Sequence, residues 1–209
     1  MRNNIKMRSN IIIAFNLFLV LSFIAGCMGR KEGRKQPDPR LKEAAITDEA
    51  VSGLSIHEAA LNGQISGVIV ILETGTDPDT IDEDGRTALM YAAFNGHTET
   101  VKRLIEKGAN VNLRDPNGRT PLMMAASGPY AETVRILLEN NADPDLADSQ
   151  EYFTALMFAA AEGQLDVVRV LLSNRADPSL RDVDGDDALT FAINNGHKAV
   201  ADLLRSMKK

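Results

Sequence analysis

The chain has 209 residues, of which 44% are hydrophobic and 25% are charged, so it holds enough apolar material for a sizeable core. Its net charge of −6 is unevenly distributed: residues 1–26 carry three basic and no acidic side chains, whereas residues 44–209 carry 26 acidic and 14 basic ones. This balance excludes nucleic acid as an expected partner, because phosphates would be repelled, and it favours a protein with a basic surface.

The N-terminus has the pattern of a secretory signal over residues 1–26. Three basic residues precede an apolar run from Ile11 to Ala25, which only Asn16 and Ser22 interrupt. The alternative is a membrane-spanning helix, which needs about 18 or more apolar residues, and this run is shorter. We therefore expect an exported protein.

The apolar run ends in Ile24-Ala25-Gly26-Cys27, which resembles the lipobox of bacterial lipoproteins. The resemblance implies that Cys27 is acylated before the signal is cleaved. Cys27 is the only cysteine of the chain, so an internal disulfide is ruled out; a chance cysteine beside an ordinary cleavage site is the alternative. More than one acyl chain, as the resemblance implies, anchors a protein stably to a membrane. In the enteric lipoproteins that this segment resembles, a residue other than aspartate after the cysteine favours the outer membrane. The resemblance therefore implies that Met28 directs the protein to the periplasmic face of the outer membrane of a bacterial cell envelope.

Residues 27–43 are predicted to form the lipidated cysteine and a flexible basic tether. Glycine, proline and charged residues dominate this segment, and it has almost nothing to bury. A coil of about 16 residues reaches roughly 20–25 Å, which is enough to lift a domain off the lipid headgroups. Its basic residues are expected to be solvated, and contact with anionic lipid is the alternative.

Residues 44–209 are dominated by a repeat of 33 residues. Spacings of 33, 33, 34 and 33 separate the equivalent positions Leu54, Thr87, Thr120, Thr154 and Asp187. The predicted repeats are residues 49–81, 82–114, 115–147, 148–181 and 182–209. Each has an apolar first segment, with a small pair such as Ala92-Ala93 in the first four units and Ala192-Ile193 in the last. A second segment with apolar residues at helical spacing follows, so each unit is predicted to be a helix hairpin. Turn sequences rich in Asp, Pro, Asn and Gly join the units.

The repeats resemble the ankyrin repeat family over about residues 49–209. The resemblance rests on Thr120-Pro121-Leu122, on Gly96-His97 and Gly196-His197, and on Gly108-Ala109-Asn110-Val111-Asn112. It implies an all-α solenoid of about five helix-turn-helix repeats with projecting β-turn fingers. We expect a monomer that binds another protein.

Three departures from the family pattern carry expectations of their own. The usual histidine of the first helix is replaced by Met90, Met123, Met157 and Thr190, so methionine packing must substitute for hydrogen bonds. Gly128-Pro129-Tyr130 stands where the second unit has Asn95-Gly96-His97, which predicts an altered link between the helices. Arg175 stands where the first two units have Gly75 and Gly108 and the third has Asn141. A left-handed arginine costs about 1 kcal/mol or more, which predicts a remodelled repeat end.

No constellation of catalytic or metal-binding residues is recognisable, so we predict no enzyme, no catalytic residue, no metal and no cofactor. His97 and His197 are expected to lie about 33 Å or more apart in a stack of repeats. His57 is assigned to a structural hydrogen bond. The acidic run of residues 182–187 invites a calcium interpretation, but glycine is fourth and Ile193 twelfth, where an EF-hand needs glycine sixth and glutamate twelfth. An acidic turn is the preferred interpretation.

The resemblance implies that the fingers and first helices line the face that meets the partner. The predicted contact residues are Glu83, Asp84, Arg86, Phe94, Asn95, Asn117, Arg119, Glu151, Tyr152, Phe153, Asp184 and Asp186. The extra residue behind the spacing of 34 falls beside Tyr152 and Phe153, so both are expected to be exposed aromatic anchors; the alternative is that Phe153 folds back onto its repeat. Tyr91, Met124, Phe158 and Phe191 share one register position and are interpreted as packing between repeats.

The leading hypothesis for function is a membrane-anchored protein-binding module that inhibits, or protects against, an envelope-acting hydrolase or toxin. It rests on the predicted anchor, the acidic repeats and the missing active site. The alternative is a structural scaffold or tether for an envelope assembly without inhibitory activity. An enzyme is disfavoured, because the repeats account for nearly all residues after the tether.

Overall fold

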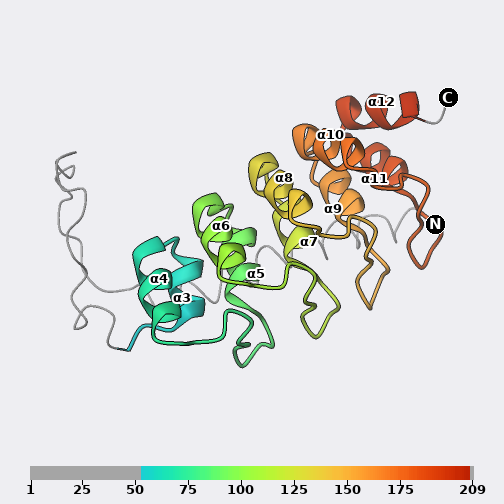
Figure 1. The fold of residues 1–209 in the computed structure, drawn as a ribbon. Coiled ribbons are helices and arrows are strands. Elements are labelled where there is room, and N and C mark those ends of the chain that lie inside the picture. The colour runs from blue at the N-terminus through green and yellow to red at the C-terminus, as the bar shows by residue number, and fades with distance from the viewer. Residues whose placement is uncertain (1–52, 208–209) are drawn as a thin grey trace, which may run out of the picture. The chain divides into compact units, whose positions relative to one another are not determined.

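The computed structural model describes residues 53–207, which form ten helices in five hairpins (Figure 1). The first helices are α3 (Ile56–Leu61), α5 (Ala88–Phe94), α7 (Pro121–Ala126), α9 (Ala155–Ala161) and α11 (Ala188–Asn194). The second helices are α4 (Ile65–Glu73), α6 (Thr98–Glu106), α8 (Ala131–Glu139), α10 (Leu165–Ser173) and α12 (Lys198–Met207). Between the helices of this range only two isolated antiparallel bridges occur, Ile81 with Thr87 and Ala147 with Thr154. The predicted signal, the Cys27 anchor and the tether lie outside the described residues.

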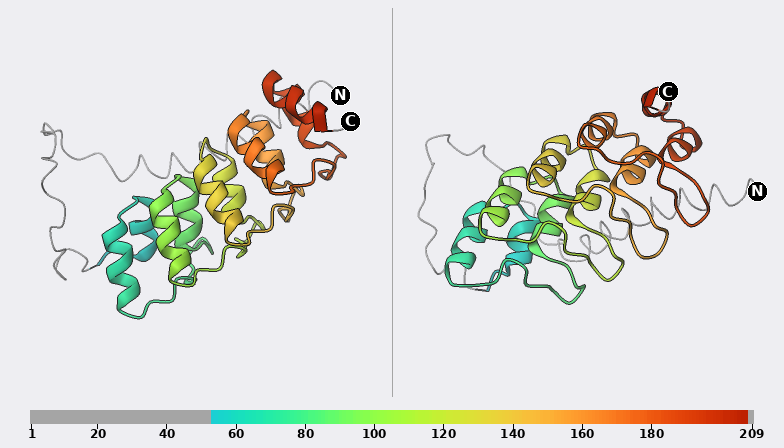
Figure 2. Two further views of the ribbon diagram at one scale, coloured as in Figure 1. Left: turned by 45° about the horizontal axis from the view of Figure 1, so that its top comes forward. Right: turned by 45° about the vertical axis from the view of Figure 1, so that its right-hand side comes forward.

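The hairpins stack so that each helix touches its counterpart in the next repeat. Contacts run from α3 to α5, α7, α9 and α11 in one row and from α4 to α6, α8, α10 and α12 in the other, as Figure 2 shows. Small residues make this close approach possible: Ala59, Ala92, Ala125 and Ala159 are all fully buried. The predicted all-α repeat solenoid is therefore confirmed.

Each first helix begins at a side chain that caps its free amides. Thr87, Thr120 and Thr154 accept hydrogen bonds from the backbone amides of Met90, Met123 and Met157, and Ser55 and Asp187 cap α3 and α11 in the same way. Such caps stabilise a helix by about 0.5–2 kcal/mol each. The three methionines are at most 2% exposed, so the predicted methionine packing is confirmed.

The second helices of the first four repeats are followed by a residue with positive φ. These residues are Gly75 (φ +89°), Gly108 (+95°), Asn141 (+67°) and Arg175 (+68°). The expectation of a remodelled end at Arg175 is wrong. The amides of Arg175 and Ala176 donate to the carbonyls of Leu172 and Leu171, both at 3.1 Å, and these bonds keep the regular helix end in spite of the strain.

Histidine and asparagine join the repeats at the two ends of the stack. His97 and Asn95 donate to the Leu61 carbonyl of the preceding repeat at 3.0 and 2.9 Å. His197 and Asn195 donate to the Ala161 carbonyl at 2.9 and 2.8 Å. His57 donates to the Thr80 carbonyl at 2.8 Å, so its predicted structural hydrogen bond is confirmed.

The third repeat has a different link between its helices, as its sequence predicts. The His97 amide donates to the Ala92 carbonyl at 2.9 Å, whereas the equivalent Tyr130 amide makes no such bond among the described residues. The Tyr130 ring instead occupies the space beside Gly96, where a Cβ atom would collide with it. Between the second and third repeats, an aromatic contact thus replaces the histidine and asparagine hydrogen bonds that join the repeats at the two ends of the stack.

Candidate protein-binding surface

Four fingers project between successive hairpins, and each is organised by its first residue, an aspartate. We call residues 82–86, 115–119, 148–153 and 182–186 fingers 1 to 4. In each finger the aspartate amide donates to the carbonyl of the last residue at 2.9–3.0 Å. The aspartate Oδ1 accepts two or three further backbone amides of the same finger. The side chain of aspartate therefore fixes the loop conformation in advance of any binding.

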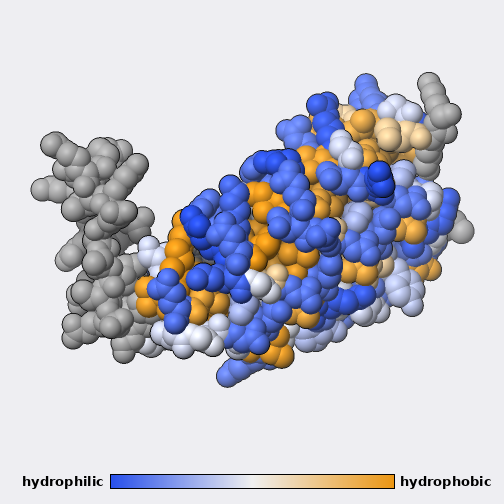
Figure 3. All heavy atoms as spheres, in the orientation of Figure 1, coloured by the Kyte–Doolittle hydropathy of each residue, from blue (hydrophilic) through white to orange (hydrophobic). Residues whose placement is uncertain are grey.

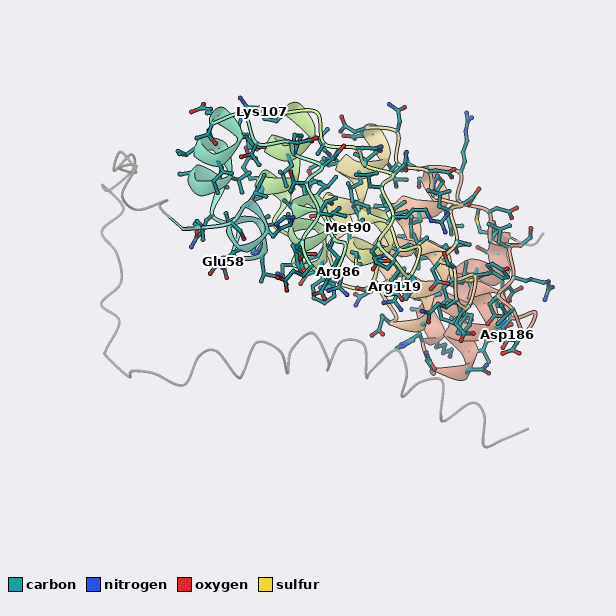
Figure 4. All side chains as sticks on the ribbon, turned by 90° about the horizontal axis from the view of Figure 1, so that it is seen from below. Glu58, Arg86, Met90, Lys107, Arg119 and Asp186 are labelled. Atoms are coloured by element: carbon teal, nitrogen blue, oxygen red, sulfur yellow. The ribbon has the colours of Figure 1, made fainter. Side chains whose placement is uncertain are left out.

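Fingers 2, 3 and 4 are also bonded to one another. The Ser149 amide donates to the Asn117 carbonyl at 2.8 Å, and the Val183 amide donates to the Glu151 carbonyl at 3.1 Å. Pro116 is the equivalent residue of finger 2, and it has no amide hydrogen to donate to finger 1. Its ring packs beside Gly85 of finger 1 instead. The four fingers therefore form a connected edge, which we call the finger edge. Figure 4 shows Arg86, Arg119 and Asp186 in succession along it.

The two predicted finger arginines are mostly buried and contact groups of the fingers and first helices. The side chains of Arg86 and Arg119 are each 15% exposed. Their guanidinium groups lie 5.9 Å from the ring centroids of Tyr91 and Phe158, and their Nε atoms lie 3.9 and 4.0 Å from the carboxylates of Asp115 and Asp148 in the next finger. Their main contribution is to join neighbouring fingers.

The two predicted aromatic anchors of finger 3 differ in exposure. Tyr152 is 55% exposed, as expected, but Phe153 is only 8% exposed. The Phe153 ring lies edge-on between Phe158 and Phe191, with centroid distances of 5.5 and 4.8 Å. The expectation that Phe153 is an exposed anchor is therefore wrong, and the alternative of packing on the repeats is the one observed. The reason is register: Phe153 occupies the position that Arg86 and Arg119 have in fingers 1 and 2.

The other predicted contact residues differ in their exposure to solvent. Glu83, Asp84 and Asp184 are exposed, and Phe94, Asn95, Asn117, Glu151 and Asp186 are half-buried. The Asn95 side chain is engaged with Leu61, so its first role is to join repeats. Sequence reasoning missed Ile81 and Val183, which are 61% and 49% exposed beside or within fingers. An apolar residue in an otherwise acidic turn was the available signal for Val183.

The shared register position of the first helices is mainly a packing position. Met124, Phe158 and Phe191 are 4–6% exposed, which confirms the predicted packing between repeats. Tyr91 is half-buried, and its hydroxyl donates to Asp82 Oδ2 at 2.6 Å. Tyr91 thus links its helix to finger 1 by a hydrogen bond.

Burial and this hydrogen bond alter the ionisation of both partners. Burial, and then the bond to Asp82, raise the pKa of Tyr91 to about 12. For Asp82, burial acts in the upward direction, but hydrogen bonds from Tyr91 and from the amides of Arg86 and Asp84, with the charge of His57, outweigh it. They hold the pKa of Asp82 below its usual range.

Alkaline titration is expected to detect Tyr91. Because its pKa is higher in the folded chain than the ordinary value of about 10, its stabilising contribution is complete below that pH and is lost as the pH rises toward 12. Absorbance of ionised tyrosine in the native protein should show one component delayed to about pH 12. Tyr91→Phe should remove that component alone. If the delayed component persists in this variant, the assignment fails.

Acidic residues outnumber basic ones in the connecting segments but are nearly balanced by them in the second helices. The four connecting segments, residues 74–87, 107–120, 140–154 and 174–187, hold 15 acidic and six basic residues. The five second helices hold seven acidic and six basic residues, and many of these pair, such as Glu99 with Arg103 at 3.2 Å and Asp202 with Arg205 at 2.8 Å. Figure 3 shows hydrophilic side chains over much of one face, with apolar patches between them. The excess of negative charge therefore lies in three of the four connecting segments, residues 74–87, 140–154 and 174–187, whereas residues 107–120 have one acidic and three basic residues.

Two further properties concern residues 53–207 alone. No group of three or more His, Cys, Asp or Glu side chains in that range is arranged to hold a metal ion. None of the helices in the same range combines the length and apolar character that crossing a membrane requires.

Five stacked helix hairpins with hydrogen-bonded fingers define the class of helical-repeat solenoids. Residues 56–148 match a family model described as ankyrin repeats (3 copies), and residues 129–172 and 156–205 match one described as ankyrin repeats (many copies). The chain belongs to the ankyrin repeat family. No curated protein matches it in sequence. Ankyrin repeats are modules for protein–protein interaction and are typically not enzymes, so the finger edge is the candidate binding surface.

Proposed function

We propose that this chain is an exported lipoprotein whose ankyrin repeats bind a protein with a basic surface at the bacterial envelope. Cys27 would carry the acyl anchor, residues 27–43 would be the tether, and a monomeric repeat domain would present its finger edge. The observation that carries the binding proposal is the charge division, with 15 acidic and six basic residues in the connecting segments and near balance in the second helices. Concentrated charge of one sign accelerates and orients association with an oppositely charged partner.

The accessible acidic residues of the edge make the proposal testable. Glu83 and Asp84 are exposed in finger 1, and Asp184 is exposed in finger 4. The carboxylates that hold the fingers closed, such as Asp115 and Asp148, are 3–4% exposed and belong to the structure of the loops. A partner would therefore be attracted by all of these charges but would contact the exposed set.

Capture from detergent-solubilised envelopes tests the binding proposal. The full chain is used as bait, and Asp84→Lys/Asp184→Lys is compared with Glu106→Lys/Glu139→Lys, which makes the same charge change on the second helices. We expect the wild type and the second-helix variant to recover the same protein, and the finger variant to recover about tenfold less. Recovery should also decrease as salt is raised. Equal recovery by both double variants would refute the assignment of the surface.

The proposed biological role is inhibition of, or protection against, an envelope-acting hydrolase or toxin. It follows from a binding module that is anchored at the place where such enzymes act. The captured partner's activity, measured with and without stoichiometric chain, tests it. A fall in activity is expected, and full activity in the saturated complex would favour a scaffold instead.

A further inference from the structure

We propose that Tyr152 and Val183 form a paired apolar contact on neighbouring fingers that binds a cationic segment carrying an apolar side chain. The two residues are called the Tyr152–Val183 pair below. This inference rests on the protein-binding function proposed above and names the chemistry of the partner at one place on the finger edge.

The two residues are close because fingers 3 and 4 are bonded together. The Val183 amide donates to the carbonyl of Glu151, the residue directly before Tyr152, at 3.1 Å. Tyr152 is 55% exposed and Val183 is 49% exposed. At the register of Val183, fingers 1, 2 and 3 carry Glu83, Pro116 and Ser149, so polar residues also fit this position of the fold.

Tyr152 has a backbone conformation that glycine adopts at the same position of the other three fingers. Tyr152 has φ +60°, and the residue at this register in fingers 1, 2 and 4 is a glycine with φ between +70° and +83°. A bulky residue is disfavoured in this left-handed conformation, whereas glycine adopts it freely. The tyrosine ring is half exposed and lies at a position where glycine would stabilise the fold, which favours a role in binding.

The pair stands on a rigid base. Phe153, directly after Tyr152, is buried between Phe158 and Phe191. Asp148 Oδ1 accepts the amides of Gln150, Glu151 and Phe153, on both sides of Tyr152. Little conformational freedom would therefore be lost when the exposed ring is covered, which favours affinity.

The surrounding charge identifies the occupant as cationic. The two connecting segments that contain fingers 3 and 4, residues 140–154 and 174–187, hold nine acidic and two basic residues, and exposed Asp184 follows Val183 in finger 4. Lysine or arginine is attracted both by carboxylates and by the face of a tyrosine ring. An apolar side chain next to the cation would cover the Tyr152–Val183 pair, whereas an acidic segment would be repelled.

Peptide titration of the full chain in neutral detergent tests this inference. The chain is labelled with ¹³C at its three tyrosines, and the probes are Lys-Leu-Lys-Leu-Lys, Lys-Ser-Lys-Ser-Lys and Glu-Leu-Glu-Leu-Glu. We expect the first probe to shift the Tyr152 signal, with at least about tenfold higher affinity than the other two. Equal affinity for the lysine–serine probe, or for the glutamate–leucine probe, would overturn the inference.

Glycine variants separate binding from folding. Tyr152→Gly should raise the denaturant midpoint and weaken the lysine–leucine probe by about tenfold or more. Arg175→Gly removes the same kind of backbone strain outside the fingers, so it should raise the midpoint and leave binding unchanged. Unchanged binding by Tyr152→Gly would overturn the inference. If envelope capture still depends on Asp84 and Asp184 in that case, the wider binding function stands without this contact.

Discussion

Replacing Phe153 with alanine is expected to lower the free energy of unfolding by about 3 kcal/mol. The ring is 8% exposed and contacts both Phe158 and Phe191, so the substitution removes apolar contacts between finger 3 and the first helices of two repeats. A cavity would remain, because finger 3 is held in place by its hydrogen bonds to Asp148 and cannot collapse into the space. Urea unfolding followed by far-ultraviolet circular dichroism measures the change.

Tyr152→Ala is the matched control for this experiment. It truncates the neighbouring aromatic residue, but that ring is 55% exposed, so a change within about 0.5 kcal/mol is expected. The backbone conformation stays equally unfavourable for alanine and tyrosine, since both have a Cβ atom. A destabilisation below about 1 kcal/mol for Phe153→Ala, or similar effects for both substitutions, would contradict the assignment of Phe153 to the core.

If Cys27 carries the anchor as proposed, Cys27→Ser is expected to abolish palmitate labelling and to leave the signal of residues 1–26 uncleaved, because acylation precedes cleavage. Each buried methylene of an acyl chain contributes about 0.8 kcal/mol, so more than one chain gives stable attachment, whereas the variant would be held only by its uncleaved signal. Fractionation of cells with metabolic labelling by palmitate measures both attachment and acylation.

Lys31→Ala is the control for the anchor, because it changes the adjacent tether and leaves the cysteine intact. It should remain labelled and membrane-bound. Palmitate labelling of Cys27→Ser at the wild-type level would contradict acylation at this residue. Membrane attachment of an unlabelled wild-type protein would also contradict it.

The repeat architecture was predictable because it depends on patterns that recur. The period of 33, the capping residues Thr87 and Thr120, and the small residues of the first helices each recur at constant spacing, and each has a direct physical role in the structure. Family resemblance then supplied the arrangement of the hairpins. The family models that cover residues 56–205 agree with it.

The orientation of two adjacent aromatic residues was harder to predict. Composition alone treats Tyr152 and Phe153 as equals, and the extra residue of finger 3 made the whole turn seem exposed. Counting backward from the cap at Thr154 places Phe153 at the register of Arg119, which is packed against a ring, and Tyr152 at the register of Gly118. The caps and not the start of the turn set the side-chain directions.

At Arg175 the local backbone preference led to a wrong prediction. An intrinsic backbone preference of about 1 kcal/mol argued for a changed helix end. The hydrogen bonds of the helix end and the burial of Ala176, at 4% exposure, hold the regular conformation instead. Tertiary context therefore outweighed local preference at this position, as it does at Tyr152.

Photo-crosslinking in living cells tests the central claim, binding of a protein through the finger edge, most directly. A photoreactive amino acid is placed at Asp84 or Asp184 on the fingers and, for comparison, at Lys102 or Arg169 on the second helices. The account predicts one discrete crosslinked protein from both finger positions, and no such product from the second-helix positions. Crosslinks to that protein from the second helices, with none from the fingers, would contradict it.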